Sequence, residues 1–593
     1  MREARSLRQC YAANSCLSRP RAQTLKSSRL DARLSRLQTT APIRSRSAEE
    51  RSFQLPLWSV PLIVAVLYVC LFQGRSALGL AGADEPRYAA IARAMAATGD
   101  WVTLRLWGSP WFEKPVLYYW IAGAAMRVFG VSESAARLPS ALAALLAALA
   151  MAWTALRTYG LRAAWFTLLI LPSCAGLIGF ARAASPDMLF SGTLAAAMAA
   201  SVEILQKERP GWSARIAFGF FLGAATLAKG PAALILASGA ALLWGLLTRR
   251  VRAVLRLSHP LAMAAFCVTA LPWYILCSLR NPDFLRIFIW QHNFERYLTP
   301  MFEHVQPFWF FGPIVLVGIV PWTPLLYAPA REFFRARSEK KWTDSPACYF
   351  ACWAAFPVIF FSLSQSKLPG YVLPAIPPLM LLIATGAARG AERNDSGTQV
   401  AAASIGCVFP LLIGIASTQV KNFPPLLSPQ IYRHAQDALI LAIAAGLAIA
   451  ALALRPQMKG ALPAAATLVA ALVLWINLAL LPRLDPFLSA RATSETLQAL
   501  DPSLQMHLAV YRAPRQFTYG VEYYLNRALP EWTHSVEQPV LVFTDSEGAG
   551  EILASGAEVH FYKGTQMPGV LLLQVERASA PGAQTQEPAK PRI

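Results

Sequence analysis

The sequence predicts an α-helical membrane protein with many spans and a small α/β domain at its C-terminal end. Of its 593 residues, 55% are hydrophobic and only 15% are charged, and the mean hydropathy is +0.40. This composition does not describe a series of soluble domains. Apolar windows of about 17 to 22 residues recur along the chain, and each is long enough to cross ~30 Å of hydrocarbon as a helix. The C-terminal part instead contains short apolar runs of strand length.

We expect about thirteen membrane helices from these windows. They lie near residues 57–73, 137–156, 163–181, 187–205, 213–229, 231–247, 259–278, 308–329, 347–363, 371–388, 400–417, 437–454 and 462–481. Barrel strands are excluded because the runs are too long and too uniform, and because backbone groups in lipid must be satisfied within the segment.

The first 55 residues differ from the rest of the chain. They hold eleven Arg, one Lys and only four acids, with no sustained apolar period. We interpret them as a disordered cytoplasmic arm on anionic lipid, or as a start codon assigned too far upstream. A signal or transit peptide is the weaker interpretation, because no small-residue cleavage site follows the first span.

Short loops set the orientation, since Lys and Arg favour the cytoplasmic side. With the N-terminal arm inside, every inner loop is basic. The inner residues are Arg157, Arg162, Lys207, Arg209, Arg215, Arg249, Arg250, Arg252, Arg256, Arg331, Arg335, Arg337, Lys340, Lys341, Arg389, Arg393, Arg455 and Lys459. The net charge of +21 is therefore largely a topology signal, and no nucleic-acid partner follows from it.

Ionisable residues of five motifs gather on the opposite, outer side. They are Asp84, Glu85, Arg87, Glu113 and Lys114 in the first outer loop, Arg182 to Asp187, Lys229-Gly-Pro, Gln291 to Arg296 with His292, and Ser366 to Tyr371 with Lys367. Ionisable side chains near hydrocarbon cost on the order of 2.5–3.5 kcal/mol each at mid-helix. Their joint placement predicts one polar, extracytoplasmic active cavity.

Each motif also has a simpler interpretation. Asp84 is suited to cap a surface helix, Lys114 to snorkel at the interface, and the Ser-Pro-Asp187 turn to cap the fourth span. His292 alone is typical of an ordinary loop histidine. Lys229 is harder to explain in this way, because a lone basic residue on the outer side opposes the charge rule.

At these motifs the chain resembles a known family. The segments are Asp84-Glu-Pro-Arg-Tyr, Gly99-Asp-Trp, Phe112-Glu-Lys-Pro, Phe129-Gly-Val, Ala136-Arg-Leu-Pro-Ser, Ala183-Ala-Ser-Pro-Asp, Ala228-Lys-Gly-Pro and Ser366-Lys-Leu-Pro-Gly-Tyr. Together they resemble the integral-membrane glycosyltransferases of the GT-C class. The likeness is strongest to the lipid A aminoarabinose transferase (ArnT-like) branch, which is related to protein O-mannosyltransferases.

The resemblance implies a first outer loop (79–136) of amphipathic helices, a membrane domain over 56–482, and a periplasmic α/β domain over 483–577. The tail fits independently, because Leu508–Tyr511, Pro539–Phe543, Val559–Tyr562 and Gly569–Val575 are typical of short buried strands. Helical stretches separate them at Phe517–Leu529 and Gly548–Leu553. Residues 578–593 are rich in Ala, Pro, Gly and Gln, which predicts a disordered tail.

Other chemistries have little support. The nine cysteines form no CxxC pair, and neither a P-loop nor a dinucleotide-binding glycine motif occurs. A secondary transporter or lipid flippase is the main rival, but transporters usually show paired repeats with broken helices, and the first-loop motif has no second copy. A transferase acting on protein Ser/Thr shares the fold class and stays open.

The resemblance implies transfer of an amino sugar, 4-amino-4-deoxy-L-arabinose or a hexosamine, from undecaprenyl phosphate to lipid A. We expect a monomer in the bacterial inner membrane with its active site toward the periplasm. Asp84 and Asp187 are the expected catalytic carboxylates, with Glu85 in support. The expected donor and phosphate ligands are Lys114 first, then Arg87, Lys229, Lys367 and Tyr371. Glu113 and His292 match positions that hold a divalent ion in this branch, and their donor atoms suit zinc.

Overall fold

The computed structural model describes residues 54–298, 306–418, 428–501, 507–533, 540–565 and 567–576. The chain divides into two units, Met1–Gln54 and Leu55–Ile593. The predicted N-terminal arm falls almost entirely outside the described residues, and the predicted tail 578–593 does so completely.

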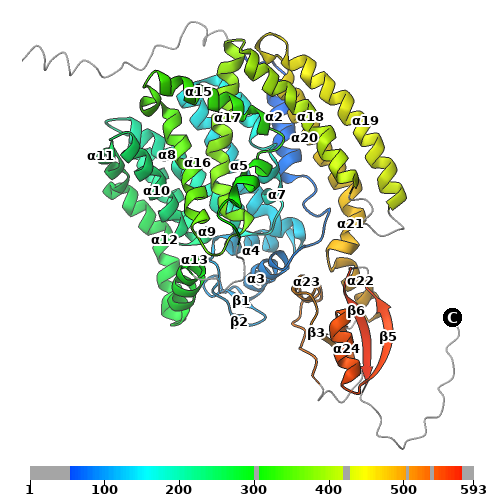
Figure 1. The fold of residues 1–593 in the computed structure, drawn as a ribbon. Helices are drawn as coiled ribbons and strands as arrows, with labels where there is room; N and C mark the ends of the chain where they lie inside the picture. Colours follow the sequence, from blue (N-terminus) through cyan, green and yellow to red (C-terminus); the bar gives the residue numbers. More distant parts are fainter. Residues whose placement is uncertain are drawn as a thin grey trace, which may run out of the picture. The chain divides into compact units, whose positions relative to one another are not determined.

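Helices make up most of the larger unit (Figure 1). Its first part comprises α2 (Ser59–Leu67), η1 (Tyr68–Phe72), α5 (Glu133–Tyr159), α6 (Leu161–Ile170), α7 (Ala175–Ala181), α8 (Pro186–Gln206), α9 (Trp212–Lys229), α10 (Ala232–Leu247), α11 (Val251–Val254), η2 (Leu255–Ser258), α12 (Pro260–Arg280), η3 (Arg286–Glu295) and α13 (Arg296–Leu298). Its second part comprises α14 (Phe311–Gly318), η4 (Thr323–Leu326), α15 (Tyr327–Ser338), η5 (Trp342–Asp344), α16 (Pro346–Ser362), η6 (Pro369–Ala375), α17 (Ile376–Glu392), α18 (Ser396–Thr418), α19 (Ser428–Ala453), η8 (Pro456–Met458), α20 (Ala461–Trp475), η9 (Ile476–Leu480) and α21 (Leu481–Leu488).

Several of these helices can span a membrane. Within the described ranges, seven are long and apolar enough to cross, or up to nine if each of two bent pairs counts as one span. The bent pairs are α6 with α7 and α14 with the η4–α15 segment, and three shorter apolar helices lie at Ser59–Phe72, Ala232–Leu247 and Pro346–Ser362. Each predicted apolar window coincides with helix. The multi-span helical fold is confirmed, while the number thirteen stays a prediction.

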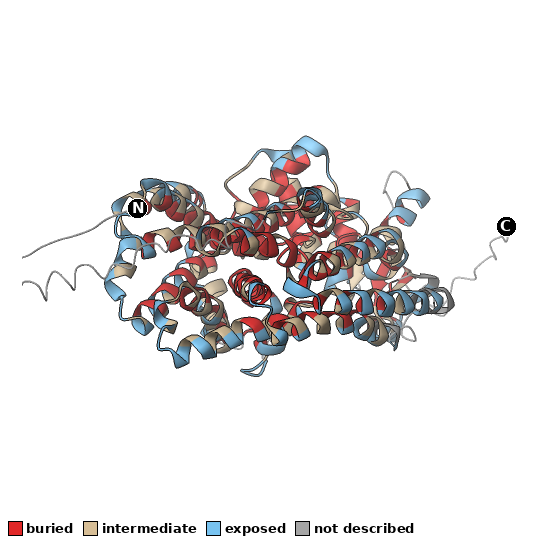
Figure 2. Ribbon diagram, turned by 90° about the horizontal axis from the view of Figure 1, so that it is seen from above, coloured by how far each residue is buried: buried red, intermediate tan, exposed pale blue. Residues whose placement is uncertain are grey.

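The long helix α5 shows how the sequence sets both the ends and the faces of a span. Ser132 accepts a hydrogen bond from the Ala135 amide and so caps the first turn, and the helix ends before Gly160, whose φ is +97°. Leu142, Leu149 and Trp153 are exposed on its outer face, where lipid would cover them. In Figure 2, seen from above, buried residues face the interior of the helical domain and exposed residues lie on its outer turns.

Small residues let the helices approach closely. A Cβ added at Gly192 of α8 would lie 2.3 Å from the Ala143 carbonyl oxygen of α5, and one added at Gly406 of α18 would lie 2.2 Å from the Gly446 carbonyl oxygen of α19. Such contacts are typical of membrane helices, whose association depends on backbone proximity and dispersion. The α5–α8 contact matters most, because these helices carry two of the motifs of the candidate site.

The first outer loop folds as predicted into helices that lie against the helical domain. It contains α3 (Asp84–Thr98), the short hairpin β1 (Arg105–Leu106) with β2 (Ser109–Pro110), and α4 (Leu117–Phe129). Helix α3 buries Tyr88, Ile91 and Met95 at helical spacing. It ends at Gly99, whose φ of +72° suits a glycine C-cap.

A small mixed sheet forms the C-terminal domain. The elements are α22 (Arg491–Leu500), β3 (Leu508–Tyr511), α23 (Arg515–Leu525), β4 (Val540–Thr544), α24 (Ser546–Ala554), β5 (Glu558–Gly564) and β6 (Leu571–Glu576). The strand order is β3-β4-β6-β5, with β3 and β4 parallel and the other pairs antiparallel. The four predicted strands are confirmed. Helix α23 ends earlier than predicted, because Asn526 takes a left-handed conformation.

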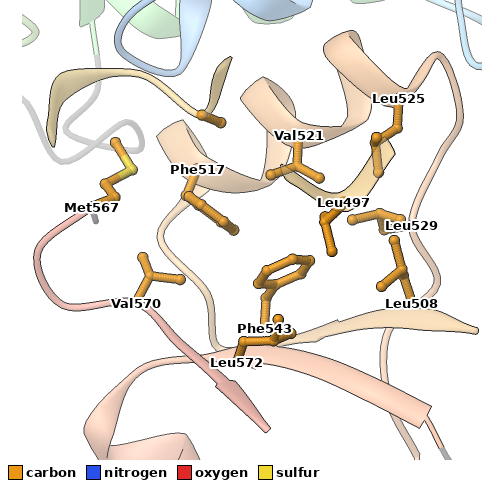
Figure 3. Packing of buried hydrophobic residues seen from close by; sticks show 11 residues of the cluster. Leu497, Leu508, Phe517, Val521, Leu525, Leu529, Phe543, Met567, Val570 and Leu572 are labelled. Atoms are coloured by element: carbon orange, nitrogen blue, oxygen red, sulfur yellow. The ribbon is translucent and has the colours of Figure 1, made fainter. Parts of the chain in front are cut away.

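Apolar clusters cover both faces of this sheet. On one face, Phe517 and Val521 of α23 pack on Phe543 of β4 (Figure 3). On the other face, Val542 packs with Ile552 of α24. Two-sided coverage is what a small mixed sheet needs for a stable core.

Candidate active site

Glu85 joins three segments at the start of α3. Its carboxylate lies 2.6 Å from a guanidinium nitrogen of Arg137 in α5 and accepts hydrogen bonds from the backbone amides of Ala81 and Ala184, at 2.9 and 2.6 Å. Arg137 is itself 4% exposed and donates to the carbonyl oxygens of Arg75, Leu78 and Gly79. These contacts hold the start of α3 against α5 and the segment before α8, and the supporting role of Glu85 stays a prediction.

Asp84 does not cap α3. It is the first residue of the helix, and the residue at the cap position, Ala83, has no side-chain hydrogen bond. The Asp84 carboxylate instead lies 2.6 Å from the Arg87 guanidinium, and its side chain is 60% exposed. The capping interpretation is wrong, and the Asp84 carboxylate stays accessible at the edge of the loop.

Arg87 connects two acids and an aromatic wall. Its guanidinium lies 2.6 Å from Asp84 and 3.2 Å from Glu113, while its side chain is only 9% exposed. Although burial alone would lower the pKa of Arg87, the neighbouring Tyr88 phenol and then the Glu113 and Asp84 carboxylates raise it overall. The rings of Tyr88 and Trp111 lie 5.4 and 5.7 Å from the guanidinium carbon, within cation–π range. Arg87 therefore holds a fixed positive charge beside the two acids.

A second cluster forms around Asp187 at the start of α8. Ser185 caps this helix by accepting from the Asp187 amide, as the Ser-Pro-Asp pattern predicted. The Asp187 carboxylate forms a short ion pair with Lys229, the last residue of α9. A Cβ added at Gly370 would lie 3.1 Å from the Asp187 carboxyl carbon, so η6 lies directly against this acid. The Lys229 ammonium is also 5.0 Å from the Tyr371 ring centroid.

Tyr88 and Lys114 connect the two clusters. Burial, first of all, raises the pKa of the Tyr88 phenol well above its usual range, and the nearby charges of Asp84 and Asp187 add to the effect. Lys114, in the segment between β2 and α4, is close enough to Asp187 to attract it electrostatically. Three of the predicted motifs, in the first loop, at Asp187 and at Lys229, thus share one site, and η6 brings in a fourth through Tyr371.

Lys367 and His292 are placed differently. Lys367 is 7% exposed, and its ammonium donates to the Ser364 carbonyl oxygen at 2.6 Å. His292 lies in the π-helical segment η3. Among the residues that the structure describes, no group of three or more His, Cys, Asp or Glu side chains could hold a metal ion. Glu113 pairs with Arg87, and the zinc site stays a prediction.

The C-terminal domain reaches the site through α23, which sequence reasoning missed. The Tyr519 ring centroid lies 5.7 Å from the Arg87 guanidinium carbon. The Arg515 guanidinium carbon lies 5.8 Å from the same centroid. Trp107 of the first loop donates to the Glu522 carboxylate at 3.1 Å. No local pattern in the tail indicates the contacts of Tyr519 with Arg87 and of Glu522 with Trp107, because these partners are separated by more than 400 residues in sequence.

The chain is similar to known proteins both in sequence and in structure. The family model of dolichyl-phosphate-mannose-protein mannosyltransferases matches residues 57–288. The undecaprenyl phosphate-alpha-4-amino-4-deoxy-L-arabinose arabinosyl transferase of Erwinia tasmaniensis is 34% identical over 308 residues, which are 51% of this chain and 54% of that protein. Transferase 2 of Sodalis glossinidius is 36% identical over 332 residues, which are 55% of this chain and 58% of that protein. The chain thus spans little more than half the length of these curated relatives.

A solved structure covers more of the chain. The crystal structure of ArnT from Cupriavidus metallidurans bound to undecaprenyl phosphate matches 89% of this chain and 99% of its own, with a TM-score of 0.71 and 25% identity. Its apo form matches with the same TM-score and 26% identity.

Together, the many-span helical domain, the helical first loop that carries the carboxylates and the C-terminal sheet give the chain the fold of the integral-membrane glycosyltransferases of the GT-C class. Within that class, the chain is similar to ArnT over most of its length, and residues 57–288 are similar to protein O-mannosyltransferases.

Proposed function

We propose that this protein transfers an amino sugar, 4-amino-4-deoxy-L-arabinose or a close analogue, from undecaprenyl phosphate to a phosphate group of lipid A. The observation that carries the proposal is the match to the undecaprenyl-phosphate-bound ArnT over 99% of that chain. The names of the curated relatives support the sugar and the lipid carrier. The lipid A acceptor rests on the resemblance of the first-loop motifs to the aminoarabinose transferase branch.

The proposed site faces the periplasm of the bacterial inner membrane, and the protein acts as a monomer. Support for the orientation comes from charge, because the predicted inner loops are all basic whereas Asp84 and Asp187 lie at the opposite ends of the helices. A lipid-linked donor also fits a chain without a nucleotide-binding motif. The lipid carrier needs only lateral access from the bilayer.

In the proposed reaction, the bond between the anomeric carbon and the undecaprenyl phosphate oxygen breaks, and a lipid A phosphate oxygen forms the new bond to that carbon. Two phosphates must then lie near one another. Lys114 is proposed to bind the donor phosphate, and Arg87 and Lys229 offset the remaining negative charge. Undecaprenyl phosphate leaves with the electron pair of the broken bond.

The carboxylates are proposed to act on the sugar rather than on a proton. A phosphate monoester has a second pKa near 6 and is already mostly ionised at neutral pH, so it needs no base. As the bond to the leaving phosphate stretches, positive charge develops on the sugar ring. Asp84, accessible at the edge of the loop, and Asp187, across the site, would stabilise that charge and orient the donor.

The test uses mass spectrometry of lipid A from a strain that lacks the gene and from the same strain carrying the wild-type chain or Asp187→Asn. We expect an amino-sugar adduct that disappears on deletion and returns only with the wild-type chain. The mass difference identifies the sugar. Lipid A that is identical in all three strains, under conditions where the protein is made, would refute the assignment.

A second candidate is transfer to a protein hydroxyl. One observation favours it, namely the match of residues 57–288 to the protein mannosyltransferase family model. A hydroxyl must lose its proton, so Asp84 would then act as a base. Glycoproteomics of the same deletion strain separates the two, because only this candidate predicts the loss of O-linked sugar from periplasmic proteins.

A further inference from the structure

A charged cavity lies at the far end of α17 from the candidate active site. Helix α17 starts next to η6, which lies against Asp187, and its 17 residues span about 25 Å at 1.5 Å per residue. The cavity has a volume of about 320 Å³ and is lined by the last turns of α17, by α15 and by the segment that leads into α18. It is therefore separate from the site described above.

The cavity walls carry more positive than negative charge. Three arginines, Arg331, Arg335 and Arg393, line it together with two acids, Glu332 and Asp395. Arg331 forms a short ion pair with Asp395, and Arg393 forms one with Glu332. Glu332 also lies 3.4 Å from Arg389, so this one carboxylate serves two guanidinium groups. The acids are thus shared or fully used, and a cationic excess remains.

Arg335 is the lining arginine whose ion-pair partner lies outside the cavity lining. Its ion-pair partner is Glu339, at 3.4 Å, which directly follows the end of α15, and the two side chains are 58% and 42% exposed. Exposed pairs of this kind hold their partners weakly. Arg331 and Arg393 are also about half exposed. A ligand arriving from outside can therefore contact the guanidinium groups without breaking the fold.

The start of α18 occupies Asp395, the second acid of the cavity. Asp395 accepts hydrogen bonds from the amide and the hydroxyl of Thr398, at 2.9 and 2.6 Å. A Cβ added at Gly390 would lie 2.5 Å from the Thr398 hydroxyl oxygen, so glycine at this position lets the first turn of α18 approach α17. Asp395 is thus shared between the positive end of the α18 dipole and Arg331, and it neutralises the arginine less completely than an acid with a single partner would.

The position of the cavity identifies the kind of anion. Lys340 and Lys341 follow α15 on the same side, which is the basic and hence cytoplasmic side by the charge rule. Basic pockets between membrane helices on the cytoplasmic side suit anionic lipid headgroups, and arginine forks match phosphate oxygens. We propose that this cavity binds the phosphate of an anionic phospholipid from the leaflet opposite the candidate active site.

The test measures lipid binding to the purified, delipidated full-length chain in neutral detergent by native mass spectrometry. Phosphatidylglycerol, phosphatidylcholine and inorganic phosphate are the three probes. We expect phosphatidylglycerol to bind in preference to phosphatidylcholine, and Arg335→Gln to weaken its binding about tenfold through the loss of one charge-assisted contact. Glu332→Gln should tighten binding, because it releases two arginines toward the ligand.

Arg250→Gln is the matched control. Arg250 forms an exposed ion pair with Asp344 at 2.9 Å, outside the cavity lining, and its loss should leave phosphatidylglycerol binding unchanged. Opposite effects of the Arg335 and Glu332 variants support the proposal, since a purely structural network would lose order in both. Equal affinity for the two lipids, or weaker binding in both variants, would overturn it. Displacement of the lipid by inorganic phosphate at similar concentration would overturn the assignment to a lipid.

Discussion

Replacement of Asp84 by Asn tests whether this acid stabilises charge or removes a proton. The change keeps the shape of the side chain and removes one negative charge. Stability should change by less than about 1 kcal/mol, because the Asp84–Arg87 pair is exposed on the acid side. Arg87 keeps Glu113 as a partner at 3.2 Å. A loss of activity in this variant can then be assigned to the reaction itself.

The magnitude of that loss follows from the surroundings of the carboxylate. Two unit charges about 4 Å apart attract by ~1 kcal/mol in water and ~4 kcal/mol at an effective dielectric constant near 20. Asp84 is 60% exposed in the free protein, and a bound lipid-linked sugar would cover part of it. An intermediate value of about 2 kcal/mol corresponds to a roughly thirtyfold lower rate of transfer.

The assay measures sugar transfer by the purified variant from a synthetic lipid donor to lipid A across about pH 5.5 to 8, a range that spans the acceptor phosphate pKa near 6. If Asp84 stabilises charge on the sugar ring, the transfer rate of Asp84→Asn should be lower than that of the wild type by a factor that changes little with pH. If Asp84 instead removes a proton from the acceptor, the rate difference between Asp84→Asn and the wild type should shrink as rising pH ionises the phosphate. Asp344→Asn, which removes an acid from another Arg pair, serves as control and should keep full activity. Near wild-type rates for Asp84→Asn at every pH would refute any catalytic role.

Four further predictions concern neighbouring features. Lys114→Ala should raise the KM for the lipid donor about tenfold or more with normal expression; unchanged kinetics would remove it from the donor site. Tyr519→Ala should lower transfer by about twofold to thirtyfold, because cation–π contacts such as that with Arg87 are worth ~0.5–2 kcal/mol, whereas Tyr519→Phe should not; equal loss in both would point to the hydroxyl. Burial raises the pKa of Glu522, so this side chain binds a proton more tightly in the folded chain than in the unfolded one. The melting temperature should therefore fall as pH rises from the ordinary Glu range through the raised pKa. If the melting temperature of Glu522→Gln depends on pH as steeply as that of the wild type, this prediction is wrong. Removal of divalent ions should lower transfer, and zinc alone should restore it, if the predicted zinc site exists; full activity in a chain shown to be metal-free would exclude a requirement.

Most of the fold could be predicted from the sequence, because hydropathy and turn chemistry act locally. The windows around α5 and α8 were identified by length and apolarity, and Ser185 was expected to cap its helix. The strands of the C-terminal domain were placed by short apolar runs between turns. The breaks between α6 and α7 and within α14–α15 were not predicted. Average hydropathy over a window does not register where a span bends.

The site was predicted only in part. The charge rule placed the motifs on one side of the membrane, but it gives no pairing, and the Asp187–Lys229 ion pair depends on how α8 and α9 pack. Asp84 was open to a capping interpretation because a helix start with an acid and a nearby proline is typical of a cap. Tyr519 could not be found, since its contact with Arg87 joins two separate domains.

Direct transfer by the purified full-length chain tests the central claim. The wild-type protein is incubated in detergent with undecaprenyl phosphate-α-4-amino-4-deoxy-L-arabinose and lipid A, with Asp187→Asn run in parallel, and both lipid products are identified by mass spectrometry. The proposed function predicts sugar-modified lipid A and free undecaprenyl phosphate in equal amounts with the wild type, and neither product with the variant. Release of undecaprenyl phosphate only when a Ser/Thr peptide replaces lipid A, or no transfer to lipid A from this donor or its hexosamine analogue, would contradict it.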